Sequence, residues 1–295
     1  MECAPLNARG IDLPIGPHRV IHAEDSGPVP YDGPTVVLEA GAASTRSIWA
    51  LVHQRLAQSV HTIAYDRAGL GRSPGASGPR RLENLARDLN ALLDGLERAG
   101  RSTAAHGVVL VGHSWGGPIV RAAAMRRPER VRALVLVDPA DELCPYYLSP
   151  GFARMNALQA VLFPPLARLG ALGPMYARSV PMLPEHARAD SRTEMYTPQA
   201  VRTQLAESAD MAGDLRLLGA ADEAAEDPGF PVTVISGASA AGVGRAVRAQ
   251  MNAAHRERAG RTAAGRHVLA QDSGHLVMLT EPGAVSEEIL RTIGR

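Results

Sequence analysis

The sequence contains no lysine, only two cysteines, and no long hydrophobic run. All 31 basic residues are therefore arginine, which together with the abundant alanine and glycine is more typical of a GC-rich coding sequence than of a functional demand. Cys3 and Cys144 lie far apart, and their spacing fits neither a disulfide framework nor a thiolate zinc site. No stretch approaches the roughly 20 apolar residues of a membrane-spanning helix, so we expect no membrane span.

Further absences narrow the possible functions. The formal net charge is only +1, which argues against a polyanionic partner such as nucleic acid. We find neither the HExxH spacing of a zinc enzyme nor a GxxxxGK[ST] phosphate loop, and DRAGLGRS at 66–73 lacks the third glycine of a dinucleotide site. We therefore expect no metal and no cofactor. Residues 1–10 lack the apolar core of a secretory signal, so we expect a cytoplasmic protein.

The residues that are present alternate between short β-branched runs and longer helical patterns. This alternation predicts an α/β fold, with a mostly parallel central sheet and helices on both faces. The clearest helical pattern is a single apolar face of six leucines. These are Leu82, Leu85, Leu89, Leu92, Leu93 and Leu96. The predicted strands cover residues 11–15, 19–23, 35–38, 61–65, 108–111, 133–137, 232–235 and 267–270.

The alternation breaks between about residues 143 and 227. This segment has a helical composition, contains five of the nine methionines, and carries prolines that should interrupt its helices. We expect those interruptions at Pro164-Pro165, Gly173-Pro174, Pro181 and Pro184. The pattern predicts a lid of short helices, residues 143–227, inserted after the sixth strand into a core domain formed by residues 1–142 and 228–295.

A nucleophile motif follows the fifth predicted strand. Residues 112–116 read GHSWG, which fits G-x-S-x-G between a strand and a helix whose first turn holds Pro118. A tight turn at this place strains the backbone of Ser114 and exposes its hydroxyl, and it needs glycine on both sides. A surface serine in a glycine-rich turn is the alternative, but the flanking strand and helix favour a nucleophile.

Five segments together resemble the α/β-hydrolase superfamily over essentially the whole chain. They are VVLEAGAAS at 36–44, YDRAGLGRS at 65–73, LVGHSWGG at 110–117, LVLVDPADE at 134–142 and SGHLVMLTEP at 273–282. The resemblance implies the α/β-hydrolase fold, with Ser114 as nucleophile and His275 as general base. It also implies that the backbone N–H groups of Ala42 and Trp115 form an oxyanion hole. His113 is expected to be a packing residue, and Asp66 and Arg67 to organise a neighbouring loop.

The acid of the triad departs from the family pattern. Its usual place, after the strand that follows the lid, reads SGASAAG at 236–242 and contains no carboxylate. Some family members carry the acid one strand earlier, where Asp138 stands, so we predict Asp138 as the acid and Asp141 as the first alternative. Asp138 could instead cap the next turn. The weaker candidates are Asp222, Glu223, Asp227 and Asp272.

A serine nucleophile argues against the dehalogenase and epoxide hydrolase branches, which attack with aspartate. The resemblance therefore predicts hydrolysis of an ester, thioester or lactone through an acyl-enzyme. The lid methionines, Phe152 and Phe163 suggest a small-molecule substrate with an apolar portion, although these residues could simply attach the lid to the core. Glu39 could meet a cationic substrate group or face the adjacent helix.

Two other functions stay open at this point. The same triad could serve a lyase, a carbon–carbon bond hydrolase or a cyclising thioesterase. The chain could also be a non-catalytic ligand-binding relative, because the usual acid position is empty of carboxylates. The patterns leave the oligomeric state open.

Overall fold

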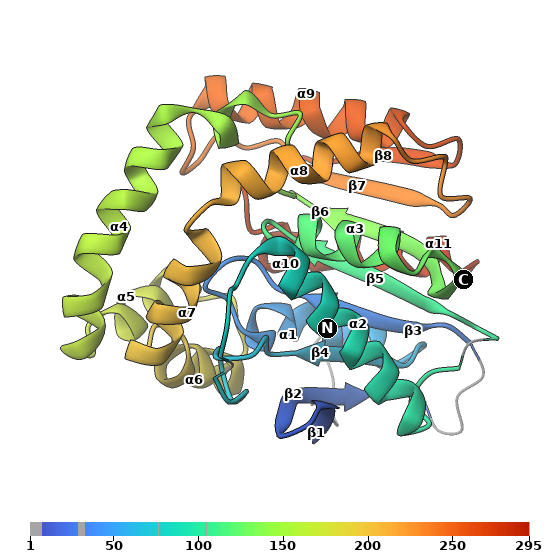
Figure 1. Cartoon of the computed structure of the whole chain (residues 1–295), viewed down its shortest axis with the longest axis horizontal. Helices are drawn as coiled ribbons and strands as arrows, with labels where there is room; N and C mark the ends of the chain where they lie inside the picture. Colours follow the sequence, from blue (N-terminus) through green and yellow to red (C-terminus); the bar gives the residue numbers. More distant parts are fainter. Residues whose placement is uncertain (1–7, 29–32, 76, 104, 295) are drawn as a thin grey trace.

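A computed structural model describes residues 8–28, 33–75, 77–103 and 105–294, which leaves Cys3 outside the described residues. Its centre is one eight-stranded sheet with the order β1-β2-β4-β3-β5-β6-β7-β8 (Figure 1). The strands from β3 to β8 pair in parallel, whereas β2 is antiparallel to both of its neighbours, β1 and β4. The strands are β1 Arg9–Gly16, β2 Arg19–Ser26, β3 Thr35–Glu39, β4 Thr62–Tyr65, β5 Val108–His113, β6 Val131–Val137, β7 Val232–Gly237 and β8 Gly265–Ala270. The predicted α/β fold is confirmed.

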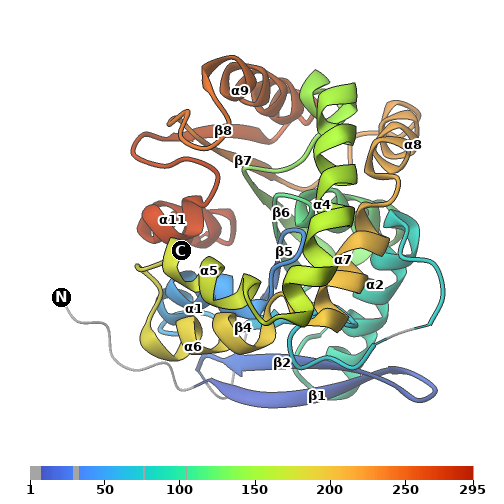
Figure 2. The same ribbon diagram turned by 90° about the vertical axis from the view of Figure 1, so that its left-hand side faces the viewer.

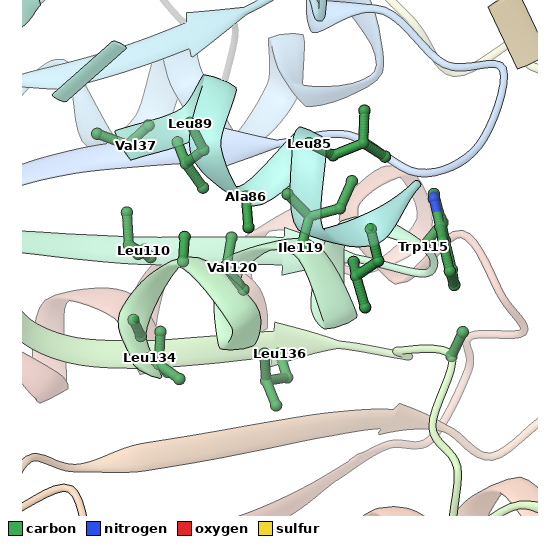
Figure 3. Packing of buried hydrophobic residues seen from close by; sticks show 14 of the residues in the cluster. Val37, Leu85, Ala86, Leu89, Leu110, Trp115, Ile119, Val120, Leu134 and Leu136 are labelled. Carbon is green, nitrogen blue, oxygen red and sulfur yellow. The ribbon is translucent and has the colours of Figure 1, made fainter. Parts of the chain in front are cut away.

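Both faces of the sheet are buried because side chains alternate along each strand. On β5, Leu110 belongs to the cluster formed with α2 and α3, whereas Val109 and Val111 belong to the cluster on the opposite face with α1 and α11. Figure 3 shows the first cluster, where Leu85 and Leu89 of α2 lie over the sheet. All six leucines of the predicted α2 face are buried. The covering helices are α1 Ala50–Leu56, α2 Leu82–Arg98, α3 Gly116–Arg126, α9 Arg245–Gly260, α10 Val277–Thr280 and α11 Pro282–Thr292.

The segment from β6 to β7, which we call the β6–β7 connection, carries the remaining helices after the short η3 turn (Pro145–Leu148). They are α4 Pro150–Arg168, α5 Leu172–Ser179, α6 Glu185–Glu194, α7 Pro198–Ser208 and α8 Met211–Glu223. The predicted interruption at Pro164-Pro165 is wrong, because α4 continues through both prolines. The carbonyls that lose their helical donors belong to Ala160 and Val161, which are exposed and can bind water instead.

Buried ion pairs fasten part of this connection to the sheet. Arg46, in the 3-10 turn Arg46–Trp49, donates from Nη1 to Asp66 after β4 at 2.6 Å and to Glu194 of α6 at 2.6 Å. Arg67 pairs with Glu207 of α7 at 2.9 Å. These pairs join α6 and α7 to the loop after β4. In the described part of the chain, no helix combines the length and apolar character needed to cross a membrane.

Candidate active site

The turn between β5 and α3 holds Ser114 in a strained conformation. Its φ angle is +51°, in the left-handed region that residues other than glycine rarely adopt. A Cβ on Gly112 would lie 2.5 Å from the carbonyl oxygen of Gly116, and a Cβ on Gly116 would lie 2.7 Å from that of Glu39. Both flanking glycines are therefore required by close backbone contacts, as the motif predicts.

The loop after β3 lies directly against this turn. A Cβ on Gly41 would come within 3.1 Å of the Ser114 Cβ. Arg67 holds the loop in place, because its guanidinium donates to the Ala40 carbonyl at 2.6 Å and to the Gly41 carbonyl at 2.9 Å. Gly41 thus lies beside Ser114, and Ala42 follows Gly41 in the same loop.

Glu39 belongs to the same buried cluster. It is 1% exposed, pairs with Arg67 at 2.6 Å and accepts a hydrogen bond from the Tyr65 hydroxyl. Of the two interpretations offered by the sequence, the structure favours an internal partner for Glu39 over a cationic substrate group. Arg67 therefore holds the loop after β3 in place, in agreement with the organising role expected for it.

Asp138 and His275 meet at the carboxyl end of the sheet. Asp138 follows β6 directly, is fully buried and has a φ angle of +42°. His275 lies in the loop after β8, and its Nδ1 is 2.7 Å from Oδ2 of Asp138. This contact fixes the imidazole so that Nε2 is the nitrogen left for other partners.

Ser114 lies next to this pair, as shown by its backbone N–H and by the ring of the preceding residue, His113. Its N–H donates to the Val137 carbonyl at 3.2 Å, one residue before Asp138. The ring of His113 lies 4.7 Å from that of His275, centroid to centroid, and its Nε2 is 3.0 Å from the His275 carbonyl oxygen. No hydrogen bond joins the Ser114 hydroxyl to the His275 ring among the described contacts of these two residues. Such bonds are often long in the absence of substrate.

The second oxygen of Asp138 has partners that the sequence did not indicate. Oδ1 accepts from Nη1 of Arg248 on α9 at 2.6 Å and from the Gly237 N–H at 3.1 Å. Nδ1 of the buried His255 lies 3.9 Å away. Arg248 lies on α9, and nothing in a single sequence links it to a residue 110 positions earlier.

These partners control the protonation of Asp138. Burial by itself would raise the pKa of this carboxyl, but the hydrogen bond and charge of His275 hold the pKa well below its usual range. His255 and Arg248 add to this effect. The group is therefore a carboxylate throughout the mildly acidic and neutral range.

The first alternative acid, Asp141, lies in a different cluster. Its carboxylate is fully buried and accepts from Arg258 at 2.9 and 3.1 Å, with Arg121 at 3.5 Å. Asp222 joins the same arginines. Among the contacts described for the candidate carboxylates, only Asp138 reaches His275. The residues considered besides Asp138 are Asp141, Asp222, Glu223, Asp227 and Asp272.

His113 is a buried wall of this site. It is 2% exposed and packs edge-on against Trp49, with ring centroids 6.4 Å apart. Burial, followed by the proximity of His275, lowers the pKa of His113 to about 3. The residue is therefore a neutral packing histidine, in agreement with its expected role. Within the described residues, no group of three or more histidine, cysteine or acidic side chains is arranged to hold a metal ion.

Comparison with known proteins agrees with this architecture. The profile of the alpha/beta hydrolase family matches residues 36–288. The chain belongs to this family. A relative named "Putative carbamate hydrolase RutD", from Variovorax paradoxus (strain S110), is 34% identical over 157 residues, which are 52% of this chain and 51% of that protein. Lipase LipV of Mycobacterium tuberculosis is 34% identical over 149 residues, covering 45% of this chain and 52% of the lipase. The chain thus spans about half the length of these relatives.

Solved structures share the fold across the whole chain. An alpha/beta hydrolase from Nostoc sp. PCC 7120 superposes with a TM-score of 0.75 at 19% identity, covering 98% of this chain and 99% of that one. A thermophilic esterase from Thermogutta terrifontis has a TM-score of 0.68 at 22% identity and covers 98% and 100%. At these identities, the likeness concerns the fold.

Proposed function

We propose that this protein is a serine hydrolase that cleaves an ester, thioester or lactone through an acyl-enzyme, with Ser114, His275 and Asp138 as its triad. The observation that carries the proposal is the 2.7 Å contact between His275 Nδ1 and Asp138 Oδ2 beside the strained Ser114 turn. A serine at φ +51° and a histidine held by a buried carboxylate are costly arrangements that a merely structural turn does not need.

In the proposed reaction, the Ser114 hydroxyl attacks the substrate carbonyl carbon while Nε2 of His275 accepts its proton. Asp138 stabilises the resulting imidazolium through Nδ1. The backbone N–H groups of Ala42 and Trp115 donate to the oxyanion. Collapse of this intermediate breaks the bond to the leaving alcohol or thiol, which takes the proton from His275. A water molecule then attacks the acyl-enzyme with His275 as base, which releases the carboxylic acid and restores Ser114.

Two parts of the proposal concern the surroundings of the triad. We assign residues 143–227 as a lid subdomain, because these helices are inserted in the sequence between β6 and β7, which are neighbouring parallel strands of the sheet. The substrate class is supported by the names of two relatives, a lipase and a carbamate hydrolase, since esters and carbamates both react by attack at an acyl carbon. Arg248 is proposed as a positioning residue that holds Asp138 from the side opposite His275.

A substrate panel tests this function. Purified protein should hydrolyse p-nitrophenyl esters of short and medium acids, and the Ser114→Ala variant should lose at least about a thousandfold in kcat. A carbamate and a lactone in the same panel define the acyl class. If folded protein reacts covalently with a fluorophosphonate at Ser114 but hydrolyses none of these compounds, the result would instead favour the lyase or cyclising chemistry. Equal turnover by Ser114→Ala would exclude the proposed nucleophile.

A further inference from the structure

Exposed apolar side chains gather on one part of the surface. Nine large hydrophobic residues of the described chain are exposed, and seven of them lie between residues 155 and 182. They are Met155, Leu158, Val161, Leu162, Leu169, Met175 and Met182. Figure 1 shows α4 and α5, which carry most of them, to the left of the central sheet, and Figure 2 shows that side of the molecule facing the viewer. Single exposed hydrophobics are ordinary, but a cluster of this kind marks an interaction surface.

Helix α4 is apolar on both of its sides. Met155, Leu158 and Leu162 recur at helical spacing with Leu169 just past its end, and form one exposed stripe beside Val161. Leu158 is 58% exposed, Val161 69% and Leu169 79%. Phe152 and Ala167 on the opposite side are buried. An apolar stripe on a helix normally packs against other apolar groups, so the exposed stripe of α4 lacks its expected partner.

The segment that carries this stripe has charges of one sign. From residue 143 to residue 184 the chain contains no aspartate or glutamate, and its charged residues are Arg154, Arg168 and Arg178. All three are exposed, and the described residues provide them with no ion pair. Arg154 and Arg168 directly precede Met155 and Leu169, so their stems border the apolar stripe. Arginine at such a border can keep its guanidinium at a polar boundary while its stem lies along apolar material.

We propose that the outer face of α4 and α5 docks on an anionic lipid surface. An apolar stripe whose own segment carries only cations matches the acyl chains and the negative headgroups of such a surface. A second copy of the chain fits less well. In a two-fold dimer this face would pack against itself and bring its arginines together, and residues 143–184 supply no carboxylate to pair with them. The docking face contains no residue of the proposed triad, so it stands independently of the proposed function.

Vesicle flotation with the full chain tests the proposal. Wild-type protein should float with phosphatidylglycerol–phosphatidylcholine vesicles and bind pure phosphatidylcholine at least about tenfold more weakly. A Leu158→Gln/Val161→Gln variant should bind the anionic vesicles at least about tenfold more weakly. An Arg154→Gln/Arg168→Gln variant should lose about fivefold for each arginine and should bind with less sensitivity to salt.

A matched control is available on α8, where Leu217 is 68% exposed but lies outside the docking face. Leu217→Gln should float like wild type, and thermal melts of all variants check that they are folded. Three results would overturn the proposal: no flotation of wild type, equal binding to both vesicle types, or an equal loss in Leu217→Gln. A wild-type dimer in light scattering that becomes a monomer in Leu158→Gln/Val161→Gln would show that a second copy covers the face.

Discussion

Two buried carboxylates follow β6 within three residues of each other, yet their surroundings differ in kind. One oxygen of Asp138 contacts the titratable ring of His275, and the other contacts Arg248 and a backbone N–H. The carboxylate of Asp141 contacts the guanidinium groups of Arg258 and Arg121 and accepts a hydrogen bond from the Leu143 N–H. A carboxylate facing an imidazole can respond to a proton moving during a reaction, whereas one neutralised by arginines serves to hold elements together.

The largest effect should come from Asp138→Asn. The amide keeps the size of the side chain but no longer stabilises a protonated His275, so kcat on a p-nitrophenyl ester should fall about a thousandfold or more. Kinetics of the purified variant measure this, and a urea titration checks that it is folded. Turnover within about threefold of wild type would remove Asp138 from the proposed triad.

Asp141→Asn should produce the opposite result. Removing one charge from the buried cluster leaves Arg258 and Arg121 undercompensated, which should lower the free energy of unfolding by about 3 kcal/mol. Its kcat should stay within about threefold of wild type, because Asp141 does not contact His275. Urea unfolding and the same ester assay measure both quantities. If this variant lost activity without losing stability, the division of roles between the two carboxylates would be wrong.

Arg248→Gln should have a smaller effect that depends on pH. The guanidinium helps to hold the pKa of Asp138 below its usual range, so its removal should raise that pKa and move the acid limb of kcat/KM to higher pH. We expect kcat/KM at neutral pH to fall about tenfold. Arg248→Lys should recover part of the loss, and Arg245→Gln, an exposed position on the same helix, serves as the control. A lower stability with an unmoved pH profile would mean that Arg248 is only structural.

The smallest effect concerns His113 and acid stability. The pKa of His113 is about 3 in the folded protein against 6.5 in an unfolded chain, so only the unfolded chain takes up this proton between these values. The free energy of unfolding therefore falls as the pH falls through this range. His113→Phe keeps a ring beside Trp49 and should reduce the slope by up to about 1.4 kcal/mol per pH unit. Urea titrations near pH 6, 5 and 4 measure the slope, and identical slopes in both proteins would contradict a neutral buried His113.

Much of the fold was predictable because it depends on local patterns. β-Branched runs bounded by turns mark the strands, and the leucine spacing marks α2, whose six leucines are all buried. The turn at Ser114 was predictable because its motif spans five residues, although only Gly112 meets the backbone of a sequence neighbour, whereas Gly116 meets that of Glu39. Such signals are contained in a short window of sequence.

The remaining features depend on partners distant in sequence. The partners of Asp138 come from β7, α9 and the loop after β8. Of these partners, His275 alone was expected, and that expectation came from the family resemblance. α4 continues through Pro164 and Pro165 at a place where the freed carbonyls belong to exposed residues, which proline spacing alone does not indicate. The exposure of Met155, Met175 and Met182 likewise follows from how helices pack, whereas composition suggested a pocket or an internal contact.

Covalent labelling with a fluorophosphonate tests the central claim most directly, because the probe reacts only with a serine whose proton is removed as it attacks. Peptide mass spectrometry should locate the adduct on Ser114. The labelling rate should fall at least about a hundredfold in Asp138→Asn and stay near the wild-type rate in Asp141→Asn. Folded wild-type protein that stays unlabelled, or that carries the adduct on another residue, would contradict the account.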